Sequence, residues 1–253
     1  MRYSVLNGNQ AVSRGYPGHG GGACVSGAAA IYGSTISFNV AGQEMGSGDE
    51  GSSGALEVLN GIGTLPTTTI VNSTIAYNEA TWTGGISVQS NVVNIRNSTV
   101  ARNRAFSIGV YAPYDGVGVR TYADTLTIDS TIIANNEIAG TIFDMSARPG
   151  SVTGSNNLIT HAAETPPGTL TTDPMLGVLR LNGGPTATLA LQPGSPAIDA
   201  GNNSLDLSFD QRGSGYPRTV GMATDIGAFE YSERIFADGF ESSLSCAPQM
   251  PAP

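Results

Sequence analysis

The chain has 253 residues, of which only 12% are charged, and its acidic residues outnumber its basic ones to give a net charge of −9. A nucleic-acid partner is not expected, because phosphates require a basic face. The 34 glycines and 14 prolines favour a turn-rich β protein over a helical one.

No apolar run approaches the roughly 18 residues of a transmembrane helix, so no such segment is predicted. No basic cluster suits an anionic membrane surface either. The first thirty residues lack the charged and then apolar segments of a signal peptide. Residues 2–9 resemble the middle of a repeat instead, and we therefore expect this chain to be the C-terminal part of a longer secreted protein.

A nine-residue phrase recurs through the first half of the chain, most clearly as I-R-N-S-T-V-A-R-N at 95–103. Related copies occupy 70–78 and 31–39, and a shorter copy occupies 130–135. The serines that mark the copies are Ser34, Ser73, Ser98 and Ser130, at steps of 39, 25 and 32 residues. Such steps indicate stacked supersecondary units. The β-branched runs predict strands, and no apolar stripe of helical period is present.

The phrase also predicts a corner in the chain. Ile95 and Val100 are five residues apart, so a straight strand would place them on opposite faces. Both face one core only if the chain turns between them, and Asn97 is a residue type that turns easily. In the fourth copy Ile128 lies one residue closer to Ser130, which predicts either a shorter corner or an inward Thr127.

A third strand, opened by glycines, precedes each phrase. The three examples are Gly20–Val25, Gly84–Val88 and Gly116–Val119. The predicted fold is therefore all-β: a right-handed parallel β-helix with three-strand coils, followed by a C-terminal capping region. The right hand is expected because right-handed crossovers dominate parallel sheets; the repeat itself does not specify it.

One asparagine stands at the same place in every copy. These residues are Asn39, Asn78, Asn103 and Asn135. With coils about 4.8 Å apart, we predict that their side-chain amides bond to one another in an internal ladder. The alternative is that they occupy unrelated turns.

Neither the cysteines nor the main acidic loop predicts a metal site. Cys24 lies in a glycine-rich strand and is expected to be a buried structural thiol, whereas Cys246 lies in the final tail. Asp49 and Glu50 fall in a Gly/Ser-rich loop at 46–51. A hard cation such as Ca²⁺ needs six to eight oxygens, and no spaced Asp-x-Asp pattern is present, so a solvated loop is predicted.

After residue 160 the composition changes to Pro- and Gly-rich phrases that do not repeat. These phrases are D-P-M-L-G at 173–177, N-G-G-P-T-A-T at 182–188, L-Q-P-G-S-P-A-I-D-A-G at 191–201, D-Q-R-G at 210–213 and D-I-G-A-F-E at 225–230. The series resembles the C-terminal region of bacterial right-handed parallel β-helix proteins of the choice-of-anchor Q family, within the pectin-lyase-like fold group. The resemblance is close over about 155–230, and the upstream coils are similar to the repeats of that family.

This resemblance implies a secreted or surface-displayed solenoid, associated with the outer membrane, and brings no catalytic residues with it. The predicted organisation is coils at 1–160, a cap at 161–231 that covers the exposed strand edges at the solenoid end, and a tail at 232–253. The tail contains I-F-A-D-G-F-E at 235–241, which is interpreted either as a sorting element or as one more capping strand.

Because the fold group includes polysaccharide lyases and hydrolases, an enzyme has to be tested on residues. Gly18-His19-Gly20 resembles the G-H-G motif of polygalacturonases, but the accompanying motifs are absent. The carboxylates of the coils, none of which recurs as a pair, are Glu57, Glu79, Asp115, Asp124, Asp129, Glu137 and Asp144. The basic and nucleophilic candidates, which have no evident partners in the sequence, are Arg96, Arg102, Arg104, Arg120, His161 and Ser195. Arg102 and Arg104 are expected to form a solvated edge.

The sequence therefore predicts a non-catalytic extracellular scaffold for adhesion or glycan binding, and a polysaccharide-degrading lyase or hydrolase is the alternative. No catalytic, cofactor-binding or metal-binding residue is predicted. The expected partner is an extracellular polysaccharide or a surface protein, and a monomer is expected. The aromatic residues that could stack on sugars, or simply cover coil edges, are Tyr77, Trp82, Tyr111, Tyr114 and Tyr122.

Overall fold

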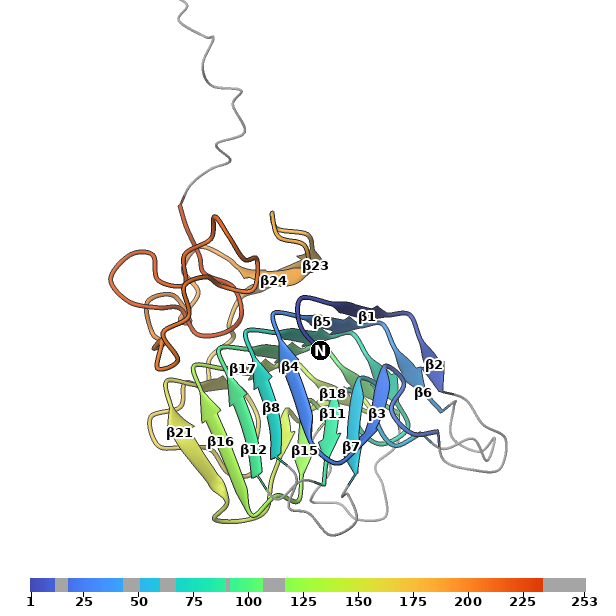
Figure 1. Ribbon diagram of the computed structural model, residues 1–253. Helices are drawn as coiled ribbons and strands as arrows, with labels where there is room; N and C mark the ends of the chain where they lie inside the picture. The colour runs from blue at the N-terminus through green and yellow to red at the C-terminus, as the bar shows by residue number, and fades with distance from the viewer. Residues whose placement is uncertain (12–17, 43–50, 60–66, 90–91, 107–116, 234–253) are drawn as a thin grey trace, which may run out of the picture.

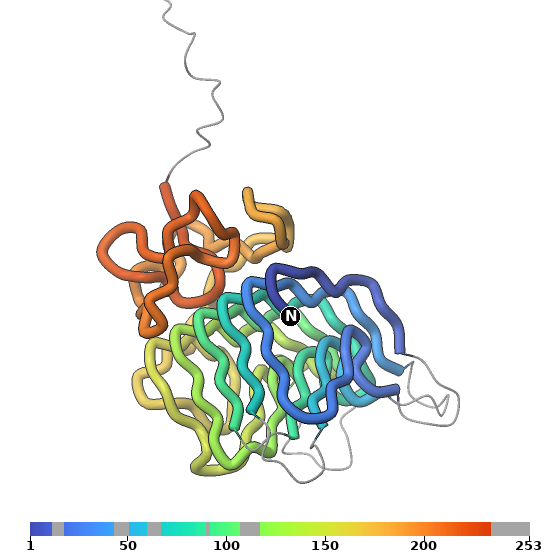
Figure 2. The backbone as a smooth tube through the Cα atoms, in the orientation of Figure 1, coloured from blue at the N-terminus to red at the C-terminus, as the bar shows by residue number. Residues whose placement is uncertain are grey.

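The computed structural model describes residues 1–11, 18–42, 51–59, 67–89, 92–106 and 117–233. Within these ranges the chain is all-β, and it forms no helix that could cross a membrane. Figure 1 shows the strands arranged in successive coils, with the C-terminal region lying beside them, and Figure 2 follows the same path as a tube.

The strands of the coils form four sheets, each named here by its first and last strand in chain order. The β3–β20 sheet contains β3 (Ala23–Ser26), β7 (Leu56–Leu59), β11 (Ile86–Val88), β15 (Val119–Thr121) and β20 (Met145–Ser146). The β4–β21 sheet contains β4 (Ala29–Tyr32), β8 (Thr67–Val71), β12 (Val92–Arg96), β16 (Thr125–Asp129) and β21 (Val152–Ser155).

The other two coil sheets each have six strands. The β1–β22 sheet contains β1 (Val5–Asn7), β5 (Thr35–Ser37), β9 (Thr74–Ala76), β13 (Thr99–Ala101), β17 (Ile132–Ala134) and β22 (Leu158–Ile159). The β2–β19 sheet contains β2 (Gln10–Ala11), β6 (Val40–Ala41), β10 (Glu79–Ala80), β14 (Arg104–Ala105), β18 (Glu137–Ile138) and β19 (Thr141–Ile142).

A coil passes through the four sheets in turn, as β3 to β6 do, and each strand pairs in parallel with its counterpart in the next coil. One pair, β18 with β19, is antiparallel. The predicted all-β stack of parallel strands is confirmed. The prediction of three strands per coil is wrong, because a fourth strand of only two residues follows each ladder asparagine; that length is too short to show a sequence pattern.

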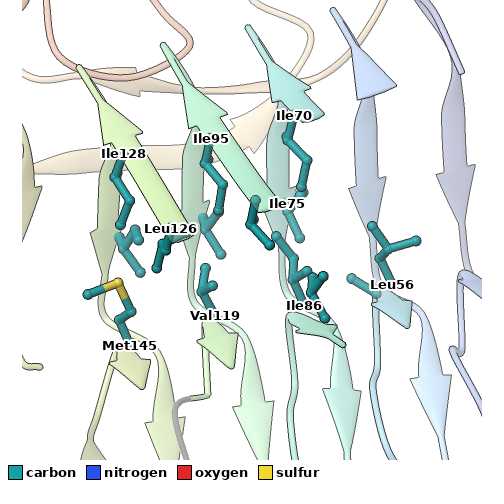
Figure 3. Packing of buried hydrophobic residues seen from close by; sticks show 14 of the residues in the cluster. Leu56, Ile70, Ile75, Ile86, Ile95, Val119, Leu126, Ile128 and Met145 are labelled. Atoms are coloured by element: carbon teal, nitrogen blue, oxygen red, sulfur yellow. The ribbon is translucent and has the colours of Figure 1, made fainter. Parts of the chain in front are cut away.

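The predicted corner at Asn97 is confirmed. Asn97 has a φ of 44°, in the left-handed region, and Ile95 and Val100 on either side of it are both fully buried. Figure 3 shows that Ile70, Ile95 and Ile128 from neighbouring coils stack along the core. Burial of these aliphatic side chains, each worth about 1.5–3 kcal/mol, is the main stabilising term in the coils.

The fourth copy of the phrase has a different register from the predicted one. Ile128 pairs with Ile95 and faces the core, so the corner is not shortened, and Ile132 pairs with Thr99. Thr131 therefore occupies the place of Ser98, and Ser130 is the corner residue, with a φ of 46°. The sequence misleads here because Ser-Thr occurs one position early and both residue types fit the corner.

The ladder exists, and the rung in the fourth copy of the phrase is Asn136, not Asn135. Asn135 is the left-handed residue just before the rung, with a φ of 60°. Asn39 donates its side-chain amide to Asn78 Oδ1, Asn78 to Asn103 Oδ1, and Asn103 to Asn136 Oδ1, each at 2.9 Å. Each Oδ1 also accepts the backbone N–H of the preceding rung. Asn9 in the first coil donates in the same way to Asn39 Oδ1 at 2.8 Å, so the ladder has five rungs, from Asn9 to Asn136.

Asp144 ends the ladder. Its Oδ1 accepts the backbone N–H and the side-chain amide of Asn136 at 2.8 and 2.9 Å. Its Oδ2 accepts the Thr160 hydroxyl and the His161 N–H. Burial raises the pKa of Asp144 above its ordinary value, although all of these hydrogen bonds act to lower it. A carboxylate suits this place because it only accepts hydrogen bonds when ionised.

The region after the coils covers two different surfaces. At the solenoid end, Ile159 N–H donates to Leu170 O and Leu170 N–H donates to Asn157 O, both at 2.8 Å. Residues 174–231, called the cap here, instead lie on the outer face of the β1–β22 sheet and include the hairpin of β23 (Leu176–Arg180) and β24 (Thr188–Leu191). The predicted end-covering role therefore belongs to residues 160–170, and the cap covers a flank.

Apolar packing and hydrogen bonds hold the cap on that flank. The contact joins outward side chains of the sheet to apolar side chains of the cap, and the set includes Ala76, Ala101, Ile132, Leu158, Leu176, Leu189, Ala197, Ile226 and Phe229. Gly227 N–H donates to Ser130 O at 2.8 Å. A Cβ at Gly227, which has a φ of 105°, would lie 2.8 Å from Thr99 Oγ1, so this position requires glycine.

Candidate functional site

The outer face of the β3–β20 sheet carries a row of polar side chains. The core-facing residues of its strands, such as Ile86 and Val119, belong to the main apolar cluster. The alternating residues therefore point outward. In register across successive strands these are Cys24, Glu57, Ser87, Arg120 and Ser146. Neighbouring members of the row are separated by one strand spacing of about 4.8 Å.

A pocket of about 330 Å³ lies at the C-terminal end of this row. Its walls are Thr121, Tyr122, Ser146, Ala147, Arg148 and Pro149. Tyr122 follows β15 directly and is 51% exposed. The Arg120 guanidinium lies 5.2 Å from the centre of the Tyr122 ring and donates a hydrogen bond to its hydroxyl at 2.5 Å. The ring is thus held at the pocket by its neighbour on the same strand.

The polar groups around the pocket complement one another. Arg148 Nη1 donates to Asp124 Oδ1 at 2.5 Å, and both side chains are exposed. The Ser146 hydroxyl belongs to a residue only 5% exposed and makes no hydrogen bond to any residue within the described ranges. The pocket therefore combines an aromatic wall with separate donors and acceptors. Small-ligand sites have this composition and begin at about 300 Å³.

A histidine–carboxylate pair lies near the other end of the row. His19 Nδ1 is 2.9 Å from Glu57 Oε2, and Glu57 also accepts the Ser52 hydroxyl. The His19 side chain is 51% exposed, whereas Glu57 is buried. A proton held on Nδ1 by the carboxylate leaves Nε2 as an available acceptor. The sequence indicated His19 but gave no sign that Glu57 is its partner.

The remaining coil carboxylates that the structure describes do not form an acid–base pair. Three pair with arginines: Asp124 with Arg148, Asp129 with Arg96, and Glu137 with Arg104. In the register of the described strands no carboxylate has another as a neighbour; Glu79 and Glu137, for example, lie on either side of Arg104. Asp115 lies outside the described residues.

His161 and Ser195 have structural roles. His161 is exposed, its Nδ1 lies 4.0 Å from Asp144 Oδ2, and its backbone N–H donates to the same carboxylate. The Ser195 hydroxyl is buried and donates to Pro174 O at 2.6 Å. Neither has the surroundings of an activated nucleophile or base.

Arg102 is not part of a solvated edge, contrary to the prediction. It donates to Tyr77 OH at 2.6 Å, to Gly177 O at 2.8 Å and to Leu176 O at 2.6 Å, so it ties β23 of the cap to the coils. Arg104, by contrast, is exposed and faces Glu137. The difference arises because Arg102 is the left-handed residue before the ladder asparagine and projects from the corner.

The other aromatic residues predicted to stack on sugars are less suited to binding a ligand than Tyr122. Tyr77 is partly buried, stacks on Phe38 at 5.2 Å between ring centres and bonds to Arg102, so it is occupied within the protein. Trp82 is partly buried. Tyr111 and Tyr114 lie outside the described residues. Of the aromatic candidates that the structure describes, Tyr122 is therefore the one that lies beside the pocket.

Cys24 is exposed, so the prediction of a buried thiol is wrong. It points outward in β3, opposite to the core side that the glycine-rich strand suggested. Partial desolvation and then the negative charge of Glu57 raise the pKa of the thiol, which keeps it protonated and unreactive at neutral pH. Cys246 and the acidic loop at 46–51 fall outside the described ranges, apart from Gly51. No group of three or more metal-binding side chains occurs among the residues described.

A buried charge cluster in the cap was not predicted. Its members, all at most 7% exposed, are Asp210, Arg212, Arg218, Asp225 and Glu230. Arg212 bonds to Asp210 at 2.7 Å, and Arg218 lies 3.3 Å from Glu230. The sequence placed both signs of charge in this region, as Asp210 and Arg212 in D-Q-R-G, Arg218, and the two acidic residues of D-I-G-A-F-E, but it gave no sign that these side chains are buried together.

The fold and these surfaces define an all-β solenoid of parallel strands with one polar and aromatic face. Comparison with protein-family models, with curated proteins and with solved structures gives no significant match.

Proposed function

We propose that this chain is part of a right-handed parallel β-helix related to the choice-of-anchor Q proteins. We further propose that it is a non-catalytic scaffold outside the cell and that it binds carbohydrate at the Tyr122 pocket. The parallel strands, the asparagine ladder and the motif series at 173–230 support the relationship. The strong preference of parallel crossovers for one hand supports the right-handed form. An extracellular or cell-surface, monomeric protein follows from the same resemblance.

The observation that carries the binding proposal is the exposed Tyr122 ring fixed by Arg120 beside a pocket of about 330 Å³. A flat aromatic ring with a polar tip suits the apolar face and the hydroxyls of a sugar. The Arg148–Asp124 pair offers both donors and acceptors without net charge. Because the whole chain carries −9, a neutral saccharide is favoured over an acidic one.

The alternative function is a polysaccharide-degrading enzyme, and the His19–Glu57 pair is the observation that favours it. An oriented imidazole can act as a general base. Within the residues that the structure describes, the carboxylates of the coils do not form the pair that glycoside hydrolysis uses, so binding without cleavage remains our proposal.

A glycan array with the wild-type chain, Tyr122→Ala and Tyr122→Phe tests this function. We expect the wild type to retain a neutral glycan, the Ala variant to bind about tenfold more weakly or worse, and the Phe variant to retain most of the binding. Tyr3→Ala is the matched control, because Tyr3 is 62% exposed and lies in the first coil, beside a separate pocket of about 610 Å³ that the cap also lines.

Equal retention of the glycan by wild type and Tyr122→Ala would contradict the binding site. Product analysis of the retained polysaccharide separates the two functions. New reducing or unsaturated ends that disappear in His19→Ala would establish the enzyme instead.

A further inference from the structure

The cap is attached to the coils next to its buried charge cluster. Arg218 Nη2 donates to Asp225 O at 2.8 Å, and its Nη1 lies 3.4 Å from Asn72 Oδ1 on a coil corner. Asp225 begins the D-I-G-A-F segment, in which Gly227 N–H donates to Ser130 O at the corner before β17 and Ala228 N–H donates to Thr99 Oγ1 of β13. The cluster therefore lies within the contact that seats the cap.

The cluster has one more acidic group than basic groups. Its three carboxylates and two guanidinium groups sum to −1 when all are ionised, and every member is at most 7% exposed. Asp199, at the edge of the cluster, adds a further negative charge but is partly exposed and accepts the backbone N–H groups of Met222 and Ala223. An uncompensated charge is costly in such surroundings, and one bound proton would make the five buried groups neutral.

The carboxylates differ in how well they can hold that proton. Asp210 accepts four hydrogen bonds, from Arg212 N–H, Nε and Nη2 and from Glu230 N–H. Glu230 is fully buried and accepts only the N–H groups of Val220 and Asp225 besides its contact with Arg218. Burial raises the pKa of Glu230 from 4.5 to about 7, against the positive charge of Arg218, and burial also raises the pKa of Asp225.

We propose that the cap is a proton-dependent clamp: one proton on the Glu230–Asp225 pair keeps the cap seated on the β1–β22 sheet, and loss of that proton loosens it. The direction of the pH dependence follows from the linkage between proton binding and cap seating. Between pH 4.5 and about 7 the seated cap holds a proton that a released, solvated cap does not. Seating is therefore strongest near pH 4.5, weakens as the pH rises through this window, and stays at its weakest above pH 7.

Amide hydrogen exchange of the full chain between pH 5 and pH 8, corrected for the intrinsic pH dependence, tests the clamp. The informative amides are Gly227 N–H and Ala228 N–H, which bond directly to the sheet. We expect their protection to fall by up to about tenfold per pH unit between pH 5 and pH 7 and then to level off. Glu79 N–H, which bonds between coils to Asn39 O, should keep its protection.

Three variants make the test specific. Glu230→Gln cannot ionise and should flatten the profile of the cap amides. If this variant fails to seat the cap at any pH, Asp225→Asn removes one negative charge from the same cluster and should also flatten the profile. Glu137→Gln, on an exposed coil pair with Arg104, is the matched control and should behave like the wild type.

Cap protection that stays constant from pH 5 to pH 8 in the wild type would overturn the proposal. So would a parallel loss of protection at Glu79, which would indicate global unfolding, or a wild-type slope in a seated Glu230→Gln or Asp225→Asn variant.

Discussion

At the residue scale, the stack depends on single backbone positions that accept the left-handed conformation. Before each ladder asparagine stands such a residue, and these are Gly8, Phe38, Tyr77, Arg102 and Asn135. Gly8 and Asn135 are residue types that reach this region readily, whereas the other three do so at a cost of about 1–2 kcal/mol. The rungs Asn39, Asn78 and Asn103 were predictable because asparagine recurs at one place in the phrase, whereas Asn9 and Asn136 were not. The left-handed aromatic and arginine residues were not, since tertiary packing rather than propensity places them.

The register of the fourth coil can be tested with two adjacent residues. Asn136→Ala removes a buried amide that bonds to Asn103 and Asp144, so we expect the free energy of unfolding to fall by about 2–5 kcal/mol. Asn135→Gly should change it by less than about 1 kcal/mol, because glycine accepts the φ of 60°. Urea unfolding of both variants measures the difference. Equal losses, or a larger loss at 135, would restore the register predicted from the sequence.

At the scale of elements, the strand β23 is attached to the coils by Arg102. Arg102→Ala removes three hydrogen bonds to Tyr77, Gly177 and Leu176, and we expect a loss of roughly 2–3 kcal/mol. Arg104→Ala is the matched control two residues away; its exposed contact with Glu137 at 3.8 Å should contribute less than about 1 kcal/mol. Thermal unfolding of the two variants, with amide exchange at β23, provides the comparison.

If both arginine variants lose the same stability, Arg102 is not the attachment point. The glycine-led strands, such as β11, were predictable from their β-branched alternation. The two-residue strands, such as β10, were not, because two residues carry no period. The sequence also did not predict that Arg102 bonds to the cap while Arg104 is exposed, because it does not show which side of a corner faces the cap.

At the scale of the whole molecule, the cap completes one flank of the solenoid. A chain ending at Asp173 would expose the outward apolar side chains of the β1–β22 sheet, including Ala101, Ile132 and Leu158. We expect this truncated chain to self-associate, because contiguous apolar surface of this kind drives association. Sedimentation velocity at several concentrations measures the effect, with Arg102→Ala as an intermediate case. A truncated chain that stays monomeric would show that the cap does not protect this flank.

The architecture of the coils followed from sequence period, because a repeating phrase can bury its apolar face only by stacking. The placement of the cap on the β1–β22 sheet could not be predicted from the sequence. Its phrases do not repeat, and its contacts join residues far apart in the chain, such as Thr35 and Gln211. At the pocket the sequence indicated only Tyr122 as an aromatic candidate, because Ser146 and Arg148 come from the next coil.

The ladder finally gives the molecule a polarity along its axis. Along the ladder, each amide from Asn9 to Asn103 donates to the Oδ1 of the next rung, and Asn136 donates to Asp144. Hydrogen bonds aligned in this way polarise one another, and their dipoles add. The line of amides therefore presents its positive end to Asp144, just as the first turn of a helix presents its positive end to an acidic residue. The buried carboxylate is thus the counter-charge of an axial dipole built entirely from side chains.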